Sequence, residues 1–228
     1  MRTLKPLRPT LLSVRTIEQV DAQLSKSLAL DPGRHTSVAL LTCDQDDSLY
    51  AALDHATKYA EVDVVYAKSF YAGSAHASGP LSGEILGILA GPNPSEVAEG
   101  VWALREALEK QIQFVTFEDD GAPAFFPHVI SESGRYLSQL AGVRVGAPLA
   151  YLIAPPTEAL VGLDAALKAA NVTLQKFFGP PTETNFAGGY LTGALPDVEE
   201  AARAFTDAIE RVVATPLGAL VGPERERR

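Results

Sequence analysis

Four carboxylates in the first half of the chain have the types and spacing to bind a cation. Asp44, Asp46 and Asp47 lie in one acidic run, and Glu84 opens an apolar stretch further along. The run lacks the glycine and the later glutamate of a calcium loop. If the strands beside Asp46 and Glu84 are sheet neighbours, the two carboxylates face one small gap. They would suit a small ammonium group, because each charge-assisted hydrogen bond contributes roughly 1.5–3 kcal/mol.

A second interpretation of the same acids needs no ligand. Asp46 or Asp47 would cap the helix that follows and complement the positive end of its dipole. Glu84 would then be an acid on the protein surface. The residues alone leave both interpretations open.

The other groups that could support catalysis are scattered along the chain. They are His35, His55, His76, His128 and Cys43. No histidine has metal-ligand spacing to another histidine or to the cysteine, and the cysteine ends an apolar strand, as small core residues do. The sequence has no nucleophile elbow, P-loop or dinucleotide fingerprint. We therefore expect no catalytic residue, no cofactor and no metal site, and a protein that is not an enzyme.

The composition argues against two classes of partner. The 228 residues carry a formal charge of −9, whereas nucleic-acid binders present a basic patch. No segment reaches the ~20 apolar residues that span a bilayer, and a lone cysteine fits a reducing compartment. We expect a cytoplasmic protein that binds neither nucleic acid nor membrane, with a disordered charged tail over about 219–228.

The elements that would position the acids occur twice. The first copy reads as a strand at 36–42, a helix at 47–59, strands at 62–66 and 84–90, and a long helix capped by Ser95. Residues 37–42, 53–58 and 62–64 have counterparts 110 positions later without a gap, and the last helix recurs at an offset of 101. The second copy has therefore lost about nine residues before that helix.

Strand–helix–strand, strand–helix is most of a ferredoxin-like split βαβ unit. The missing strand and helix lie upstream of each copy, so each unit is circularly permuted. We expect an α/β (α+β) fold of two tandem domains, over residues 1–118 and 119–228, joined at an acidic linker. Two long loops, 69–80 and 178–189, occupy matching places in the copies and are rich in Gly, Ser and aromatic residues. Loops longer than a hairpin needs usually have a function.

Several motifs resemble one family of proteins. They are the run from Val64 to His76, Ala90-Gly91-Pro92-Asn93-Pro94, Leu149 to Pro156, and Pro180-Pro181-Thr182-Glu183-Thr184-Asn185. These motifs are similar to those of the EutL family of bacterial microcompartment (BMC) shell proteins of ethanolamine utilisation. The resemblance runs from about residue 7 to residue 216.

The resemblance implies two tandem permuted BMC domains and a homotrimer that forms a flat pseudo-hexameric tile in the microcompartment shell, beside other shell proteins. It implies a gated central pore for small metabolites and a small amine ligand such as ethanolamine, bound at Asp46 and Glu84 with the backbone near Phe114. The pore-loop positions that it implies are Tyr71, Gly73, Ser74, His76, Glu183, Thr184, Asn185 and Phe186. An alternative is a cytosolic regulatory sensor, since tandem ferredoxin-like domains commonly bind small effectors at their interfaces.

Overall fold

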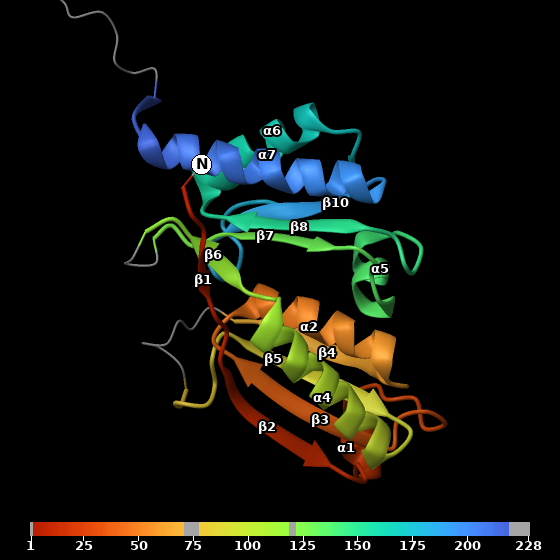
Figure 1. The fold of residues 1–228 in the computed structure, drawn as a ribbon. Coiled ribbons are helices and arrows are strands. Elements are labelled where there is room, and N and C mark those ends of the chain that lie inside the picture. The colour runs from red at the N-terminus through yellow and green to blue at the C-terminus, as the bar shows by residue number, and fades with distance from the viewer. Residues whose placement is uncertain (1, 71–77, 119–121, 219–228) are drawn as a thin grey trace, which may run out of the picture.

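The computed structural model describes residues 2–70, 78–118 and 122–218, and the chain forms two α/β halves stacked on one another (Figure 1). The first half has a four-stranded antiparallel sheet in the order β2-β3-β5-β4. Its elements are β2 (Leu11–Ile17), α1 (Ala22–Ser27), β3 (Ser37–Cys43), α2 (Asp46–Tyr59), β4 (Asp63–Ser69), β5 (Ile85–Gly91) and α4 (Pro94–Lys110).

The second half repeats this arrangement, with a four-stranded antiparallel sheet in the order β7-β8-β10-β9. Its elements are β7 (Phe126–Ile130), α5 (Arg135–Ala141), β8 (Leu149–Ala154), α6 (Pro156–Ala169), β9 (Thr173–Phe178), β10 (Ala187–Thr192) and α7 (Leu195–Ala214). Each half begins with a strand and a short helix, followed by the strand–helix–strand, strand–helix order. The predicted α/β class and the duplication are confirmed.

Helix faces match between the copies at the predicted offset of 110. The core-facing side of α2 carries Leu49, Leu53 and Ala56, and that of α6 carries their counterparts Ala159, Leu163 and Ala166. These spacings place the apolar residues on one stripe of each helix, which packs against its own sheet. The helices are therefore equivalent in sequence and in orientation.

The first core strand of each copy departs from that offset by one residue. In β3, Leu41 belongs to the core under its own helices, and the residue in the same place in β8 is Leu152, at an offset of 111. The gap-free alignment was wrong here. Both strands are almost wholly apolar, so no alternation marks their two faces, and a one-residue slip exchanges those faces.

Two helix starts also differ from prediction. The cap of α4 is Asn93, whose side chain accepts the backbone N–H of Glu96 at 3.0 Å, and Ser95 lies inside the helix. Helix α2 starts at Asp46 after Gln45, which makes no side-chain cap hydrogen bond. Neither Asp46 nor Asp47 is therefore the N-cap, and both are buried in the first turn.

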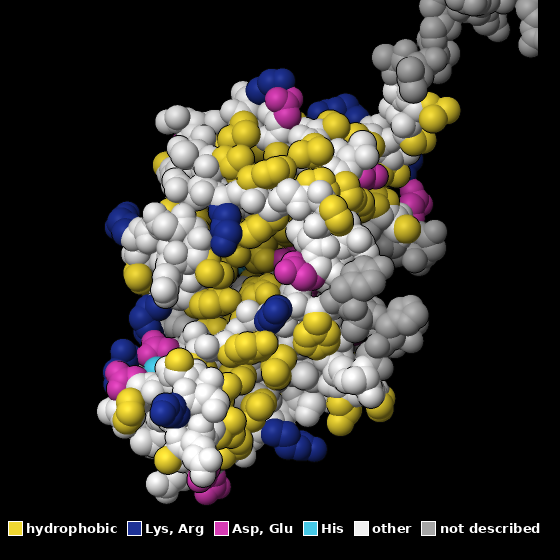
Figure 2. Space-filling model, turned by 180° about the vertical axis from the view of Figure 1, so that it is seen from behind, with side chains coloured by type: hydrophobic (Ala, Val, Ile, Leu, Met, Phe, Trp, Pro, Cys, Tyr) yellow, Lys and Arg dark blue, Asp and Glu magenta, His cyan; other side chains and the backbone are white. Residues whose placement is uncertain are grey.

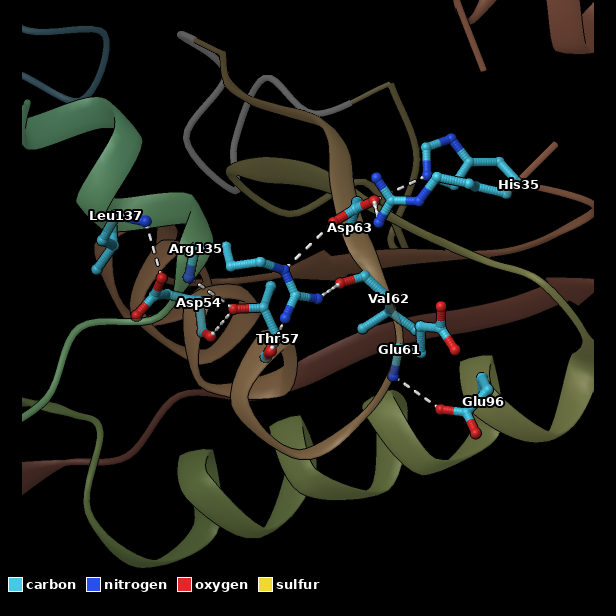
Figure 3. A network of polar contacts seen from close by, with 10 residues as sticks. His35, Asp54, Thr57, Glu61, Val62, Asp63, Glu96, Arg135 and Leu137 are labelled. Atoms are coloured by element: carbon cyan, nitrogen blue, oxygen red, sulfur yellow. Dashed lines mark hydrogen bonds and ion pairs between the residues drawn. The ribbon is translucent and has the colours of Figure 1, made fainter. Parts of the chain in front are cut away.

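Helix α5 of the second half is capped by a residue of the first half. The buried Asp54 of α2 accepts the backbone N–H of Gly134 at 2.7 Å. It also accepts the backbone N–H of Leu137 at 2.8 Å (Figure 3). A Cβ at Gly134 would lie 2.4 Å from the Asp54 carbonyl oxygen, so the close approach of α5 to α2 requires glycine there. The N-terminus of α5 thus depends on the other half for its cap.

Arg135 strengthens the same junction. Its guanidinium donates to the backbone carbonyls of Thr57 (2.7 Å) and Val62 (2.5 Å), and its Nε lies 3.4 Å from Asp63 (Figure 3). A planar guanidinium can satisfy several acceptors at fixed angles. The two halves are consequently joined by a directed polar network as well as by a shared apolar core.

The chain's first residues lie along the second half. Strand β1 (Lys5–Leu7) pairs with β6 (Phe114–Thr116), and the backbone N–H of Arg2 donates to Glu210 at 2.8 Å. Leu4 and Phe117 pack into the core of the second half. The division into residues 1–118 and 119–228 stays a prediction, and residues 219–228, predicted to be a disordered tail, lie outside the described residues.

Candidate functional site

A cavity of about 220 Å³ lies between the two halves at the N-terminal end of α2. Its walls combine carboxylates, hydroxyls and aromatic rings. The lining includes Asp46, Asp47, Tyr50, Ser69, Tyr136, Tyr151, Lys176, Phe178, Glu183, Thr184 and Tyr190. Such a mixture of apolar walls with a few polar groups is typical of small-molecule sites.

Asp46 forms the polar centre of this cavity. Its Oδ2 accepts hydrogen bonds from the hydroxyls of Ser69 (2.8 Å) and Thr184 (3.3 Å), and its Oδ1 accepts the backbone N–H of Asp47 (2.8 Å). Burial raises the pKa of the Asp46 carboxyl, although these hydrogen bonds oppose the shift. A cation beside Asp46 would stabilise its carboxylate charge, which water stabilises in an exposed aspartate.

Asp47 is buried beside Asp46 and bonds across the junction. The Tyr151 hydroxyl of β8 donates to Asp47 Oδ1. Burial raises the pKa of Asp47 well above its ordinary value, and the charges of Asp46 and Glu84 raise it further. A buried acid next to other acids holds its proton until a cation neutralises the cluster.

Glu84 belongs to the same electrostatic cluster. It precedes β5, and its backbone N–H donates to the carbonyl oxygen of Cys43 at 2.8 Å. Burial, followed by the charges of Asp46 and Asp44, raises the pKa of Glu84 to about 7. The predicted pairing of β3 with β5 is confirmed, and it brings Glu84 into the electrostatic field of Asp46. That the two carboxylates face one small gap stays a prediction.

Phe114 lies next to the second long loop. Its ring centroid is 5.7 Å from that of Phe186 and 5.0 Å from that of Phe126. Its side chain is buried in the core that joins the two halves. Glu84 and Phe114 do not line the 220 Å³ cavity, so binding of one amine by Asp46, Glu84 and the Phe114 backbone stays a prediction.

The predicted residues of the second loop cluster at the cavity. Glu183 and Thr184 line it, while Asn185 adopts a left-handed φ of 64° and closes a tight turn with Thr182. This loop is shorter than predicted, because β10 begins at Ala187. The first-loop positions Tyr71, Gly73, Ser74 and His76 lie outside the described residues.

Sequence reasoning missed the aromatic wall of the cavity. Tyr50 stacks with Tyr136 across the two halves at 6.5 Å, and Tyr151 meets Tyr190 edge-on at 4.6 Å. Tyr151 and Tyr190 lie in otherwise apolar strands. Their hydroxyl groups, which need hydrogen-bond partners, were the one feature of the sequence that could have indicated a polar cavity beside these strands.

Two kinds of feature are absent from the described part of the chain. No group of three or more His, Cys, Asp or Glu side chains there is arranged to hold a metal ion. No helix there has the length and the apolar character needed to cross a membrane. Cys43 is buried, and burial raises the pKa of its thiol to about 12, so it is unreactive at neutral pH.

Glu84→Gln is expected to stabilise the unliganded protein by about 1 kcal/mol at pH 8 and to change nothing near pH 4. The folded pKa of about 7 lies above the ordinary 4.5. The unfolded state therefore loses its proton first, and native stability falls as pH rises from 4.5 to 7. Glutamine does not titrate, and partial exposure of Glu84 keeps the effect below the full shift. Urea unfolding of the wild type and of Glu84→Gln at the two pH values measures the difference in their free energies of unfolding. The same difference at both pH values would contradict the raised pKa of Glu84.

Comparison with known proteins decides the family. A scan against family profiles finds no match. The bacterial microcompartment shell protein EutL of Clostridium perfringens is 50% identical over 212 residues, which cover 93% of this chain and 97% of that protein. A crystal structure of EutL from the same organism superposes with a TM-score of 0.92 at 49% identity, covering 96% of this chain and 99% of the other. The chain belongs to the EutL family of microcompartment shell proteins.

A second crystal structure supports the assignment. That of the ethanolamine utilization protein EutL from Leptotrichia buccalis has a TM-score of 0.90 at 49% identity and covers 93% of this chain and 98% of the other. EutL proteins are structural components of a microcompartment shell, so the predictions of tandem BMC domains and of a shell protein rather than an enzyme are confirmed. The alternative of a cytosolic sensor receives no support from these relatives.

Proposed function

We propose that this EutL-family chain forms a trimeric, pseudo-hexameric tile with a gated central pore, and that each chain binds one small primary amine such as ethanolamine at Asp46 and Glu84. The observation that carries the amine site is the cluster of Asp46, Asp47 and Glu84, whose carboxyl groups all have raised pKa values. An ammonium would stabilise the ionised carboxylates that burial disfavours.

The proposed amine site is connected to the second long loop. Thr184 of that loop donates to Asp46 Oδ2 at 3.3 Å. An ionised carboxylate is the stronger acceptor, so an amine that ionises Asp46 also strengthens its hydrogen bond to Thr184. The amine would then favour the loop arrangement described here, because a ligand shifts an equilibrium only by its unequal affinity for the two states.

Ethanolamine is expected to bind the wild-type protein with one site per chain, and Asp46→Asn or Glu84→Gln is expected to weaken binding at least tenfold. Affinity should rise from pH 6 to pH 8, since Glu84, with its pKa of about 7, must lose its proton to pair with the ammonium. Calorimetry at both pH values gives stoichiometry and affinity.

Two controls make this test specific. Ethylene glycol replaces the ammonium with a hydroxyl and should not bind, and Glu109→Gln changes an exposed acid on α4 and should bind as wild type. Undiminished ethanolamine binding in both site variants would place the amine elsewhere and leave the shell assignment intact.

The proposed trimer follows from an unequal exposure of equivalent helices. On α2, Ala51 is 3% exposed, since this face of the helix packs on the second half, whereas its counterpart on α6, Val161, is 44% exposed. The neighbouring Leu160 is 47% exposed, and hydrophobic side chains gather on the rear face of both halves (Figure 2). One copy of the helix is covered by the other half of the chain, whereas the other copy stays partly exposed among the described residues.

The first half offers the complementary surface. In the second half, Tyr151 and Ile153 on the outer face of β8 are buried against α2. Their counterparts on β3, Leu40 and Thr42, instead line an open groove of about 550 Å³. A second copy whose α6 enters this groove would repeat the contact made within the chain. Repetition of one heterologous contact gives a ring when its rotation closes, and in the proposed ring three chains supply six equivalent domains.

A further inference from the structure

A second cavity, of about 440 Å³, lies between the halves on the C-terminal part of α2. Five α2 residues line it, together with Gln111 and Ile112 just after α4 and residues of β7 and the segment after it. The chemically distinctive members are His55, Lys58, Tyr59, His128 and Glu132. None of these residues belongs to the proposed amine site.

The cavity contains hydrogen-bond donors that the protein leaves unused. Neither His55 nor His128 makes a hydrogen bond to any described residue. Their rings pack on Tyr59 (4.7 Å) and Phe126 (5.1 Å). The Lys58 ammonium makes one hydrogen bond, to the carbonyl oxygen of Glu132 at 3.0 Å. Each neutral imidazole has one N–H, and the ammonium has three.

The charge that acts on both imidazoles is that of Lys58, and the cavity lining also carries the acids Asp54 and Glu132. Burial, followed by the charge of Lys58, lowers the pKa of His55 to about 4. Burial lowers the pKa of His128 to about 4 as well, with smaller contributions from Lys58 and His55. The acids that face this region, Asp54 and Glu132, act on Lys58, and both Asp54 oxygens already accept backbone N–H groups.

We propose that this cavity binds a small tetrahedral oxyanion, such as a phosphate group, through His55, Lys58 and His128. Donors from α2 and β7 would converge on one anion, and charge-assisted hydrogen bonds to an oxyanion are the stronger kind. Bound negative charge would favour the imidazolium form of both histidines, so binding takes up protons. Since the ligand contacts both halves, it would also stabilise their junction.

Sulfate is the first probe, because it remains a dianion from pH 5.5 to pH 7.5. The full-length protein is titrated with sodium sulfate at constant ionic strength while the histidine side-chain NMR signals are recorded. We expect saturable shifts of His55 and His128 and affinity at least threefold higher at pH 5.5. His35, whose ring nitrogens are bonded to the Asp31 N–H and to the Asp63 carboxylate, should not respond.

Lys58→Gln is the decisive variant, because Lys58 is at the surface and its replacement does not threaten folding. It should weaken sulfate binding about tenfold, whereas Lys110→Gln, at an exposed lysine on α4, should leave it unchanged. Absence of a saturable shift, or equal binding by wild type and Lys58→Gln, would overturn the proposal.

Phosphate and methyl phosphate then identify the source of the anion. Equal affinity for phosphate and methyl phosphate would assign the site to phosphomonoesters as well as to the free anion. That result would support the oxyanion proposal. Binding of inorganic phosphate alone would restrict it to the free anion. Failure of this site leaves the amine proposal untouched, since the two cavities have no residue in common.

Discussion

Asp54→Ala is expected to destabilise the protein by roughly 3 kcal/mol, because it removes the cap of α5 and leaves two backbone N–H groups without acceptors. The side chain is 1% exposed, and both of its oxygens are used, by Gly134 and Leu137. Urea unfolding measures the loss, and hydrogen exchange at the Gly134 and Leu137 amides locates it.

Two further variants make this result interpretable. Asp54→Asn keeps one side-chain oxygen acceptor and should lose about half as much stability. Glu109→Ala removes an exposed acid whose ion pair with Arg105 spans 3.7 Å, and should cost less than about 0.5 kcal/mol. If Asp54→Ala lost no more than Glu109→Ala and the two amides kept their protection, the cap would not hold the halves together.

The repeat made the elements predictable, and tertiary contacts account for most of what was missed. The spacing of Leu49, Leu53 and Ala56 predicted α2 and its core face, and the duplication transferred both to α6. The face of β8 could not be predicted, because a strand buried on both sides carries no alternation. Asp54 looked like an ordinary polar helix residue, since its partners are some eighty positions away.

The candidate site was also predictable only in its local features, and its tertiary contacts were missed. Asp46 and Glu84 were predicted to share a site because their strands were expected to be neighbours. The strand pairing of β3 with β5 is confirmed, and the shared site stays a prediction. Helix capping was predicted for Asp46 or Asp47, because local sequence offers that role to any acid at a helix start. The actual partner of Asp47, Tyr151, is contributed by the other half of the molecule. Only the fold brings the two together.

Val161→Asp is expected to convert the proposed trimer into a folded monomer. Val161 is 44% exposed within the chain and occupies the place on α6 that Ala51 occupies on α2, where the residue is buried against a neighbouring domain. A carboxylate at that place would be buried without a partner, which costs several kcal/mol per interface. Native mass spectrometry of both proteins measures the change, with circular dichroism to show that the monomer is folded.

The matched control is Trp102→Asp on α4. Trp102 is 58% exposed, and its counterpart on α7 at the offset of 101, Arg203, has a side chain that is 59% exposed. Neither copy of this position contacts a neighbouring domain within the chain, so the trimer should persist. If the wild-type protein itself were a monomer, the proposal of a trimeric tile would be wrong. A trimer that survives Val161→Asp would keep the tile but show that the ring closes through a different face, because repetition of the contact between the halves places Val161 inside every interface.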